Sequence, residues 1–134
     1  MKELRKFEFK QIKEITDEMV QEIFISEKEK NDILCRTCKN KISAIDKMIE
    51  IDGKHKHTFK NPIGIAFEIG CFLTASGCTV LGTPTLEHSW FSGLSWNFAL
   101  CSHCFSHLGW YFQSSKESFF GLILENLIEN SATH

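Results

Sequence analysis

Two cysteine pairs with the same internal spacing constrain this chain more than any other feature. They are Cys35-x-x-Cys38 and Cys101-x-x-Cys104. Each pair is typical of a knuckle that presents two thiolates to one tetrahedral zinc ion, so the four cysteines together complete a structural zinc shell. The interval between the pairs, residues 39–100, is too long for a minimal zinc ribbon. We therefore expect the metal to join strands that are distant in sequence around a real core.

The remaining cysteines and two nearby histidines are not expected to bind the metal or to react as thiols. His103 and His107 lie near the second pair, but four cysteines already complete the shell. Four thiolates leave no open position for a water, so a hydrolytic role is not expected. Cys71 and Cys78 fall in apolar segments, where we expect buried small hydrophobes and not reactive thiols.

The composition is that of one globular domain. The chain has 134 residues, of which 43% are hydrophobic and 24% are charged, and its net charge is −2. This charge gives no electrostatic footprint for nucleic acid. The uncharged run 69–86 contains glycines and a proline and is too polar for a membrane span, while residues 1–14 lack the apolar core of a secretion signal. We expect a cytoplasmic protein with neither nucleic acid nor membrane as a partner.

Hydrophobic periodicity predicts a mainly β domain behind a helical extension. Within residues 1–31, apolar residues recur at three- and four-residue steps, which predicts an amphipathic helix that packs on the domain or contacts a partner. Residues 63–74 alternate as in a long half-buried strand, and 41–51 form a weaker one. His55 and His57 are expected in a solvated loop. Short apolar segments separated by turns complete an antiparallel β structure.

All three tryptophans lie close together in the sequence. They are Trp90, Trp96 and Trp110. Composition alone allows them to fill one core, because indole carries a large apolar area. Their neighbours, however, are largely serine, glycine and asparagine, which suit a surface loop better than a core. A pocket walled by three indoles would suit a small, flat or compact ligand with apolar faces.

The tryptophans and cysteines belong to a longer series of motifs. In chain order these are Cys35-x-x-Cys38, Asn61-Pro62, Glu87-His88-Ser89-Trp90-Phe91, Gly93-x-x-Trp96, Cys101-x-x-Cys104, Ser106-His107-Leu108-Gly109-Trp110 and Phe119-Phe120-Gly121-Leu122. The series resembles the cereblon-type thalidomide-binding (CULT) domain family, in its short single-domain bacterial form, over about residues 33–128. We therefore place the extension at 1–31, the domain at 32–128 and a tail at 129–134, with fraying expected from residue 125.

The resemblance implies a fold and a ligand cage. The fold would be a β-tent, in which two antiparallel sheets meet at an angle and are pinned by the four-cysteine zinc. Trp90, Trp96 and Trp110 would surround a glutarimide or related cyclic imide, with Phe112 at the base. Chemistry agrees, since a cyclic imide has an apolar CH₂ side that indole faces can bury and a polar edge that needs an acceptor and donors.

The resemblance also implies further ligand-binding residues. The expected ligand-binding set is completed by Asn61, Pro62, Glu87, His88 and Ser89. Backbone groups of His88 and Trp90, with the His88 side chain, would meet the polar edge of the imide, while Asn61 would reach substituents beyond the ring. Ile63 stands where the familiar domain has a histidine. The resemblance therefore does not carry over contacts to the outer part of larger drugs.

The leading hypothesis is a zinc-stabilised binding module for uncharged cyclic imides. Its ligands would be glutarimide, thalidomide-type drugs, uridine-like rings, hydantoins or succinimides, and the family's proposed physiological ligands are C-terminal cyclic imides on damaged proteins. No nucleophile, base or open metal accompanies the cage, so no catalysis is expected. The resemblance does not include the parts that join a ubiquitin ligase, so this chain is expected to contact no ligase adaptor.

Two alternative functions stay open. The methionine sulfoxide reductase B group is similar in its two zinc knuckles and β-tent fold, but it carries its nucleophilic cysteine well after the second pair, and this chain has no cysteine beyond Cys104. An aromatic cage can also bind methylated ammonium groups, although only Glu87 supplies negative charge nearby.

Overall fold

The computed structural model describes residues 31–130, which form a mainly β unit. The helix predicted within residues 1–31 lies outside the described residues. The elements are β1 (Asp32–Cys35), β2 (Lys41–Ala44), the short 3₁₀ helix η1 (Ile45–Lys47), β3 (Lys56–Lys60), β4 (Ala66–Phe72), β5 (Cys78–Thr85), β6 (Ser95–Cys101), β7 (His107–Gln113), β8 (Ser118–Ile123), η2 (Leu124–Asn126) and β9 (Leu127–Glu129). Within this part of the chain, no helix has the length and apolar character needed to span a membrane.

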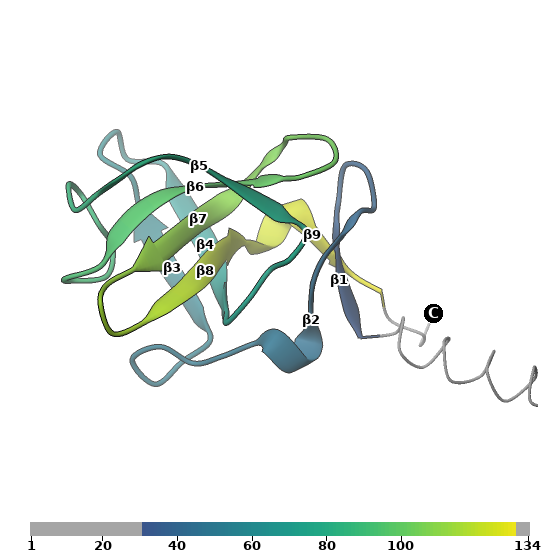
Figure 1. Ribbon diagram of the computed structural model, residues 1–134, viewed down its shortest axis with the longest axis horizontal. Coiled ribbons are helices and arrows are strands. Elements are labelled where there is room, and N and C mark those ends of the chain that lie inside the picture. Colours follow the sequence, from purple (N-terminus) through teal and green to yellow (C-terminus); the bar gives the residue numbers. More distant parts are fainter. Residues whose placement is uncertain (1–30, 131–134) are drawn as a thin grey trace, which may run out of the picture. The chain divides into compact units, whose positions relative to one another are not determined.

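The strands form two antiparallel sheets, as predicted. The larger sheet has the order β3-β4-β8-β7-β6-β5 and the smaller one the order β2-β1-β9. Figure 1 shows the smaller sheet at one end of the larger one. Hairpins connect most neighbouring strands of the larger sheet, whereas β4 pairs with β8, which is far away in sequence.

The small sheet contains a strand that the sequence did not predict. Residues 127–129, expected within a frayed tail, form β9 and pair with β1 in the register Ile33 to Glu129. The Arg36 guanidinium donates to the carbonyl oxygens of Glu125 and Leu127 at 2.7 and 3.1 Å. The prediction of fraying from residue 125 was wrong because these long-range bonds satisfy the backbone of the segment.

The long alternating strand predicted at 63–74 is shorter than its pattern. Only Ala66–Phe72 forms a strand, and Ile63 is 80% exposed. The Asn61 side-chain oxygen accepts hydrogen bonds from the backbone N–H groups of Ile63 at 3.2 Å and Ile65 at 2.9 Å. Such an asparagine turn competes with strand formation, so the first apolar residues of the pattern remain in a loop.

Two other local predictions also differ from the structure. In the segment 41–51, only Lys41–Ala44 is a strand, and η1 follows it directly. His57, expected in a solvated loop, lies in β3 and is 5% exposed. Its Nε2 atom lies 3.0 Å from the Lys54 carbonyl oxygen, and its ring stacks on Phe59, so the imidazole acts as part of an aromatic core.

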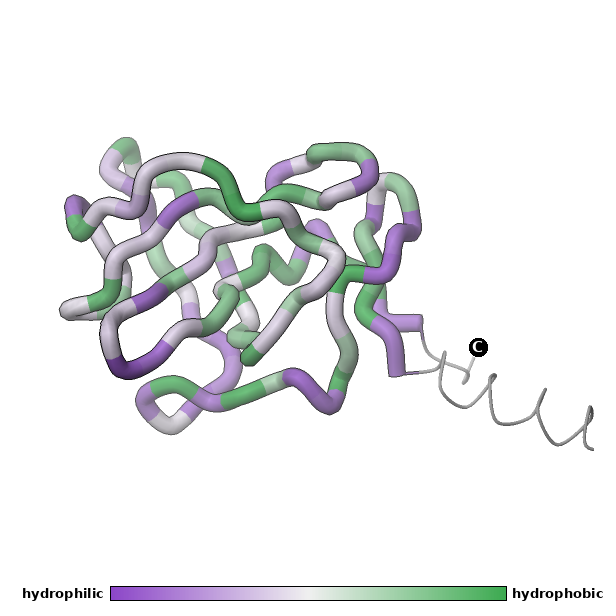
Figure 2. The backbone as a smooth tube through the Cα atoms, in the orientation of Figure 1, coloured by the Kyte–Doolittle hydropathy of each residue, from purple (hydrophilic) through white to green (hydrophobic). Residues whose placement is uncertain are grey.

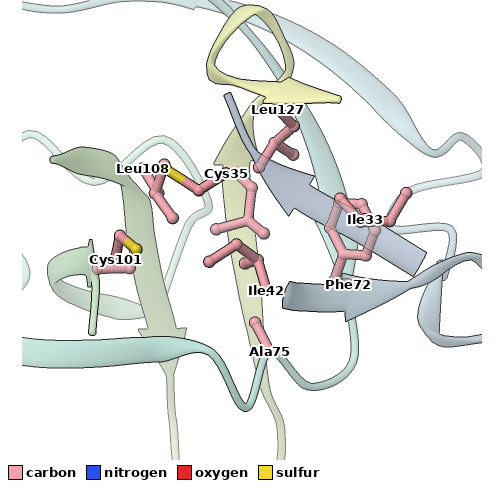
Figure 3. Packing of buried hydrophobic residues seen from close by; sticks show 10 residues of the cluster. Ile33, Cys35, Ile42, Phe72, Ala75, Cys101, Leu108 and Leu127 are labelled. Carbon is pink, nitrogen blue, oxygen red and sulfur yellow. The ribbon is translucent and has the colours of Figure 1, made fainter. Parts of the chain in front are cut away.

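Two clusters of buried residues make up the core. One contains Cys35 and Cys101 together with Leu108 and Leu127, and Figure 3 shows these side chains with residues of both sheets around them. The other is mostly aromatic and includes Phe112. Figure 2 shows hydrophobic stretches along the strands and several strongly hydrophilic stretches in turns. The first cluster therefore joins the two sheets through apolar contact.

At Gly109, the backbone of β7 comes very close to that of β8. A Cβ added at Gly109 would lie 2.1 Å from the Gly121 carbonyl oxygen and 2.8 Å from the Leu122 Cα, both backbone atoms that cannot easily move. We expect Gly109→Ala to lower the free energy of unfolding by about 3 kcal/mol or more. Urea denaturation followed by circular dichroism measures the change.

Gly53→Ala is the matched control. Gly53 has φ +85° but no atom within 4 Å of an added Cβ, so only backbone strain of about 1 kcal/mol is expected. Equal losses in the two variants would contradict the close approach of β7 and β8.

Candidate functional site

The four paired cysteines converge at one place, as predicted. Their Sγ atoms all lie within 4.8 Å of one another. The Cys35–Cys104 sulfur distance is 3.7 Å and the Cys38–Cys101 distance is 3.6 Å. A tetrahedral ion with metal–sulfur bonds of ~2.3 Å has sulfur–sulfur edges of ~3.8 Å. The cluster therefore fits one tetrahedral metal ion, and neither His103 nor His107 is part of it.

The two cysteine knuckles have the same backbone geometry. The residue after each second cysteine, Lys39 or Phe105, has a left-handed φ of 68° or 64°. Its N–H donates to the carbonyl oxygen of the first cysteine of that pair, at 2.8 Å in both knuckles. In the second knuckle, backbone N–H groups of residues 103 and 104 donate to the Cys101 sulfur at 3.4 and 3.5 Å. Such donors stabilise a thiolate and orient it toward a metal.

Two cysteines of the cluster are shifted toward the thiolate form. Burial raises the pKa of Cys35, but hydrogen bonds from the Ser106 hydroxyl and from backbone N–H groups of its own knuckle outweigh this and lower the pKa to about 6. Burial also raises the pKa of Cys101, and its backbone donors again produce a net lowering. Burial and the neighbouring thiols of Cys101, Cys104 and Cys35 raise the pKa of Cys38 to about 12. Deprotonated thiols are the metal-binding form, so a cation is needed to hold all four cysteines as thiolates.

The two cysteines outside the cluster are shifted toward the neutral thiol. Burial raises the pKa of Cys71 and that of Cys78 to about 12. A nucleophilic cysteine needs a lowered pKa and access to solvent. Both thiols therefore behave as small hydrophobes, and neither meets the requirement for a sulfoxide-reducing nucleophile.

An aromatic pocket of about 450 Å³ opens on the larger sheet. Its walls come from the β3–β4 loop, β4, the β5–β6 loop, β6 and β7, through Asn61, Pro62, Phe67, His88, Trp90, Trp96, Phe98, His107, Trp110 and Phe112. In the β6–β7 hairpin, Trp96 is directly opposite Phe112 and Phe98 is opposite Trp110. Directly opposed side chains point to the same face of a sheet, so the hairpin register builds this wall.

The three tryptophans have different environments. Trp110 is 8% exposed and belongs to the aromatic core as well as to the pocket, whereas Trp90 and Trp96 are only partly buried. The centroids of the Trp90 and Trp110 rings are 4.6 Å apart, and their planes meet at 71°. Two adjacent walls of the pocket are therefore nearly perpendicular and in direct contact.

Backbone carbonyls hold two of the indole N–H groups. Trp90 Nε1 donates to the Lys60 carbonyl oxygen at 3.0 Å, and Trp96 Nε1 donates to the Glu87 carbonyl oxygen at 2.8 Å. These bonds anchor the two tryptophans to neighbouring loops. Because the polar atoms of both rings are already bonded, the rings offer a ligand apolar faces.

The structure brings most of the expected ligand-binding residues together, but not all. Asn61, Pro62 and His88 line the pocket with the tryptophans and Phe112. Ser89 and Glu87 are not among the lining residues. The Ser89 hydroxyl lies 2.6 Å from the Leu94 carbonyl oxygen and closes its own loop, while the Glu87 carboxylate lies 3.7 Å from His88 Nε2 on the surface.

Three lining residues were not predicted from the sequence, namely Phe67, Phe98 and His107. Phe98 follows Trp96 by two positions and shares its face of β6, so the period-two rule would have found it once Trp96 was assigned to the pocket. In the sequence His107 lies near the second cysteine pair and within the motif 106–110, and neither position indicates a place in a pocket. Its Nε2 lies 2.9 Å from the Gly109 carbonyl oxygen, and burial lowers the pKa of its imidazole, which favours the uncharged ring.

Comparison with known proteins identifies relatives of part of this chain. The chain is 39% identical to cereblon of Danio rerio over 59 residues, 35% identical to cereblon of Gallus gallus over 75 residues and 36% identical to cereblon of Xenopus tropicalis over 69 residues. Part of this chain is homologous to cereblon. The matches cover 44%, 52% and 48% of this chain but only 14%, 17% and 15% of the three cereblon sequences.

The homology confirms the resemblance inferred from the motifs. It is consistent with a CULT-like domain in a short chain, although no known family profile matches the chain. The small share of each cereblon that is matched means that this chain is comparable with one part of those proteins only.

Loss of one cluster cysteine is expected to remove the metal. We expect the purified protein to carry one metal ion per chain and Cys101→Ala to carry none. The variant should also lose about 3 kcal/mol or more of unfolding free energy, because metal binding is coupled to folding. Elemental analysis and thermal denaturation measure the two effects.

Cys71→Ala is the matched control, since it removes an equally buried thiol outside the cluster. It should keep the metal and lose only the packing of a single sulfur. Metal retained by Cys101→Ala, or lost equally by both variants, would contradict the assignment of the cluster.

Proposed function

We propose that this chain is a non-catalytic, zinc-stabilised module that binds small uncharged cyclic imides between Trp90, Trp96 and Trp110. The observation that carries the proposal is the nearly perpendicular pair of Trp90 and Trp110 walls, in a chain of which part is homologous to cereblon. Perpendicular indole faces contact a compact ring on two sides, and the half-buried Trp96 provides a third. The apolar CH₂ groups of glutarimide suit such walls.

The loop at His88 supports recognition of the polar imide edge. Neither the His88 carbonyl oxygen nor the Trp90 backbone N–H has a hydrogen-bond partner among residues 31–130, and both residues line the pocket. His88 has a left-handed φ of 61°, a conformation that costs a non-glycine residue about 1–2 kcal/mol. An acceptor and a donor in a strained loop match the imide N–H and one of its C=O groups.

The charge of the pocket favours a neutral ligand over an ammonium ion. Its lining within the described part of the chain contains no Asp, Glu, Lys or Arg side chain. Aromatic cages for methylated ammonium groups gain from cation–π attraction, which a nearby carboxylate reinforces. Here the nearest candidate, Glu87, is exposed and lies beside His88 on the surface. Imides, hydantoins and uridine-like rings are therefore the preferred class.

Zinc is the metal that the four-cysteine cluster fits best. Tetrahedral sulfur ligation is typical of structural zinc, and four thiolates leave no position for substrate or water. In this proposal Cys35, Cys38, Cys101 and Cys104 hold the ion, which stabilises the fold without entering any reaction. The raised pKa values of Cys71 and Cys78 favour a binding role over sulfoxide reduction.

The proposed biological partners are proteins that end in a cyclic imide, which forms when the side-chain amide nitrogen of an asparagine or glutamine attacks its own backbone carbonyl and the peptide bond to the next residue breaks. Pro62 and Phe98 line the pocket and are both exposed, which supports a path out of the pocket for the rest of a peptide. This partner class comes from the resemblance to the CULT family.

Titration with glutarimide tests the proposal. Saturable quenching or enhancement of tryptophan fluorescence is expected, with N-methylglutarimide as the control, because methylation removes the N–H donor and adds bulk at the polar edge. Trp96→Ala should weaken glutarimide binding by about 2 kcal/mol, roughly 30-fold, while the metal content stays unchanged.

Two results would contradict the proposal. Choline or trimethyl-lysine peptide binding without glutarimide binding would show a cage for methylated ammonium groups. Unfolding of Trp96→Ala would mean that this ring is core and not a ligand wall.

A further inference from the structure

The pocket is larger than one imide ring needs. Its volume of about 450 Å³ falls in the range of ~300–1,000 Å³ that is typical of sites for drug-sized ligands. Three tryptophans account for the walls around a single ring. Pro62, Phe98 and His107 also line this pocket and are not needed to enclose one ring. A ligand that fills the pocket therefore carries a second group.

Phe98 is the outermost aromatic wall of this space. It is 43% exposed although it lines the pocket. Its ring meets Trp96 edge to face at 5.3 Å and 84°, and it meets His107 at 5.7 Å and 74°. The ring thus continues the aromatic surface of the cage outward from Trp96.

The backbone around Phe98 holds the ring in this position. Phe98 is opposite Trp110 on β7 and opposite Leu81 on β5, so its side chain points to the same face of the sheet as the cage. A Cβ added at Gly82 would lie 3.5 Å from Phe98 Cδ2, so the glycine backbone packs against the ring. One side of the ring is therefore supported, and the pocket side is available to a ligand.

We propose that Phe98 is a specificity-determining residue that stacks against a second flat, uncharged ring attached to the imide. This inference rests on the proposed function, because the imide anchors the ligand in the cage. Aromatic pairs gain affinity beyond what the buried area alone provides. The wall offers no charged side chain to an ionic substituent, since Pro62 and Phe98 are apolar and His107 is held by the Gly109 carbonyl oxygen.

Comparison of two probes tests the role of Phe98. Glutarimide carries only the imide ring, and thalidomide carries a flat phthalimide as well. We expect Phe98→Ala and Phe98→Leu to weaken thalidomide binding by about 3- to 10-fold and to leave glutarimide binding within about twofold. Phe98→Leu keeps an apolar side chain but removes the flat ring, so it separates stacking from general apolar contact. Isothermal titration measures all affinities.

Leu73→Ala is the control. Leu73 is another exposed apolar residue, 54% exposed, and it neither lines the pocket nor belongs to a cysteine knuckle. The variant should bind both probes like the unmodified protein. Metal content and circular dichroism of all variants establish that each one is folded.

The possible outcomes separate this inference from the proposed function. If the unmodified protein binds neither probe, the proposed function is overturned and the inference with it. If glutarimide binds but Phe98→Ala weakens both probes equally, Phe98 only supports Trp96 and the inference alone is overturned. Unchanged thalidomide binding in Phe98→Ala, or full affinity in Phe98→Leu, would also overturn the stacking role.

Discussion

The convergence of four thiols is the constraint on which the rest of this structure depends. Cys35 ends β1 of the smaller sheet and Cys101 ends β6 of the larger one, so the cluster joins the two sheets. Four thiolates within 4.8 Å would repel one another unless a cation neutralises them. Hydrogen bonds lower the pKa of Cys35 and that of Cys101, whereas burial and neighbouring thiols raise the pKa of Cys38, so a cation is needed to ionise all four. A metal ion bound by the cluster would therefore also hold the two sheets together.

The same cluster also connects stability to the pocket. The second knuckle is the turn of the β6–β7 hairpin, whose strands carry Trp96, Phe98, Trp110 and Phe112. A turn fixes the register of the strands that follow from it, and a slip of one residue would turn every side chain to the other face. The geometry of the knuckle therefore decides which aromatic rings face the pocket. Structural metal sites act at a distance in this way when they close a hairpin that bears a binding surface.

The fold could be anticipated in outline from local patterns, and the errors have a common cause. Period-two hydrophobicity identified β4, short apolar segments between turns indicated other strands of the larger sheet, and the cysteine spacing identified the cluster. The predictions failed for the start of β4, for β9 and for His57. In each case a contact that the pattern does not contain was decisive: an asparagine side chain within a turn, an arginine bonded to distant carbonyls, or an aromatic ring from the β5–β6 loop. Local periodicity indicates which residues prefer burial, but it does not indicate which distant residues contact them.

The sequence by itself determined the cysteine ligands, the mainly β class and the three indoles of the pocket, because spacing and residue type limit the chemistry available to each. The tertiary structure alone decided that Trp90 and Trp110 stand nearly perpendicular, that Ser89 closes its own loop, and that Phe98 and His107 extend the pocket. Those features depend on strand register and on hydrogen bonds between residues that are distant in the chain. Sequence motifs name the groups that can meet, and only packing places them against one another.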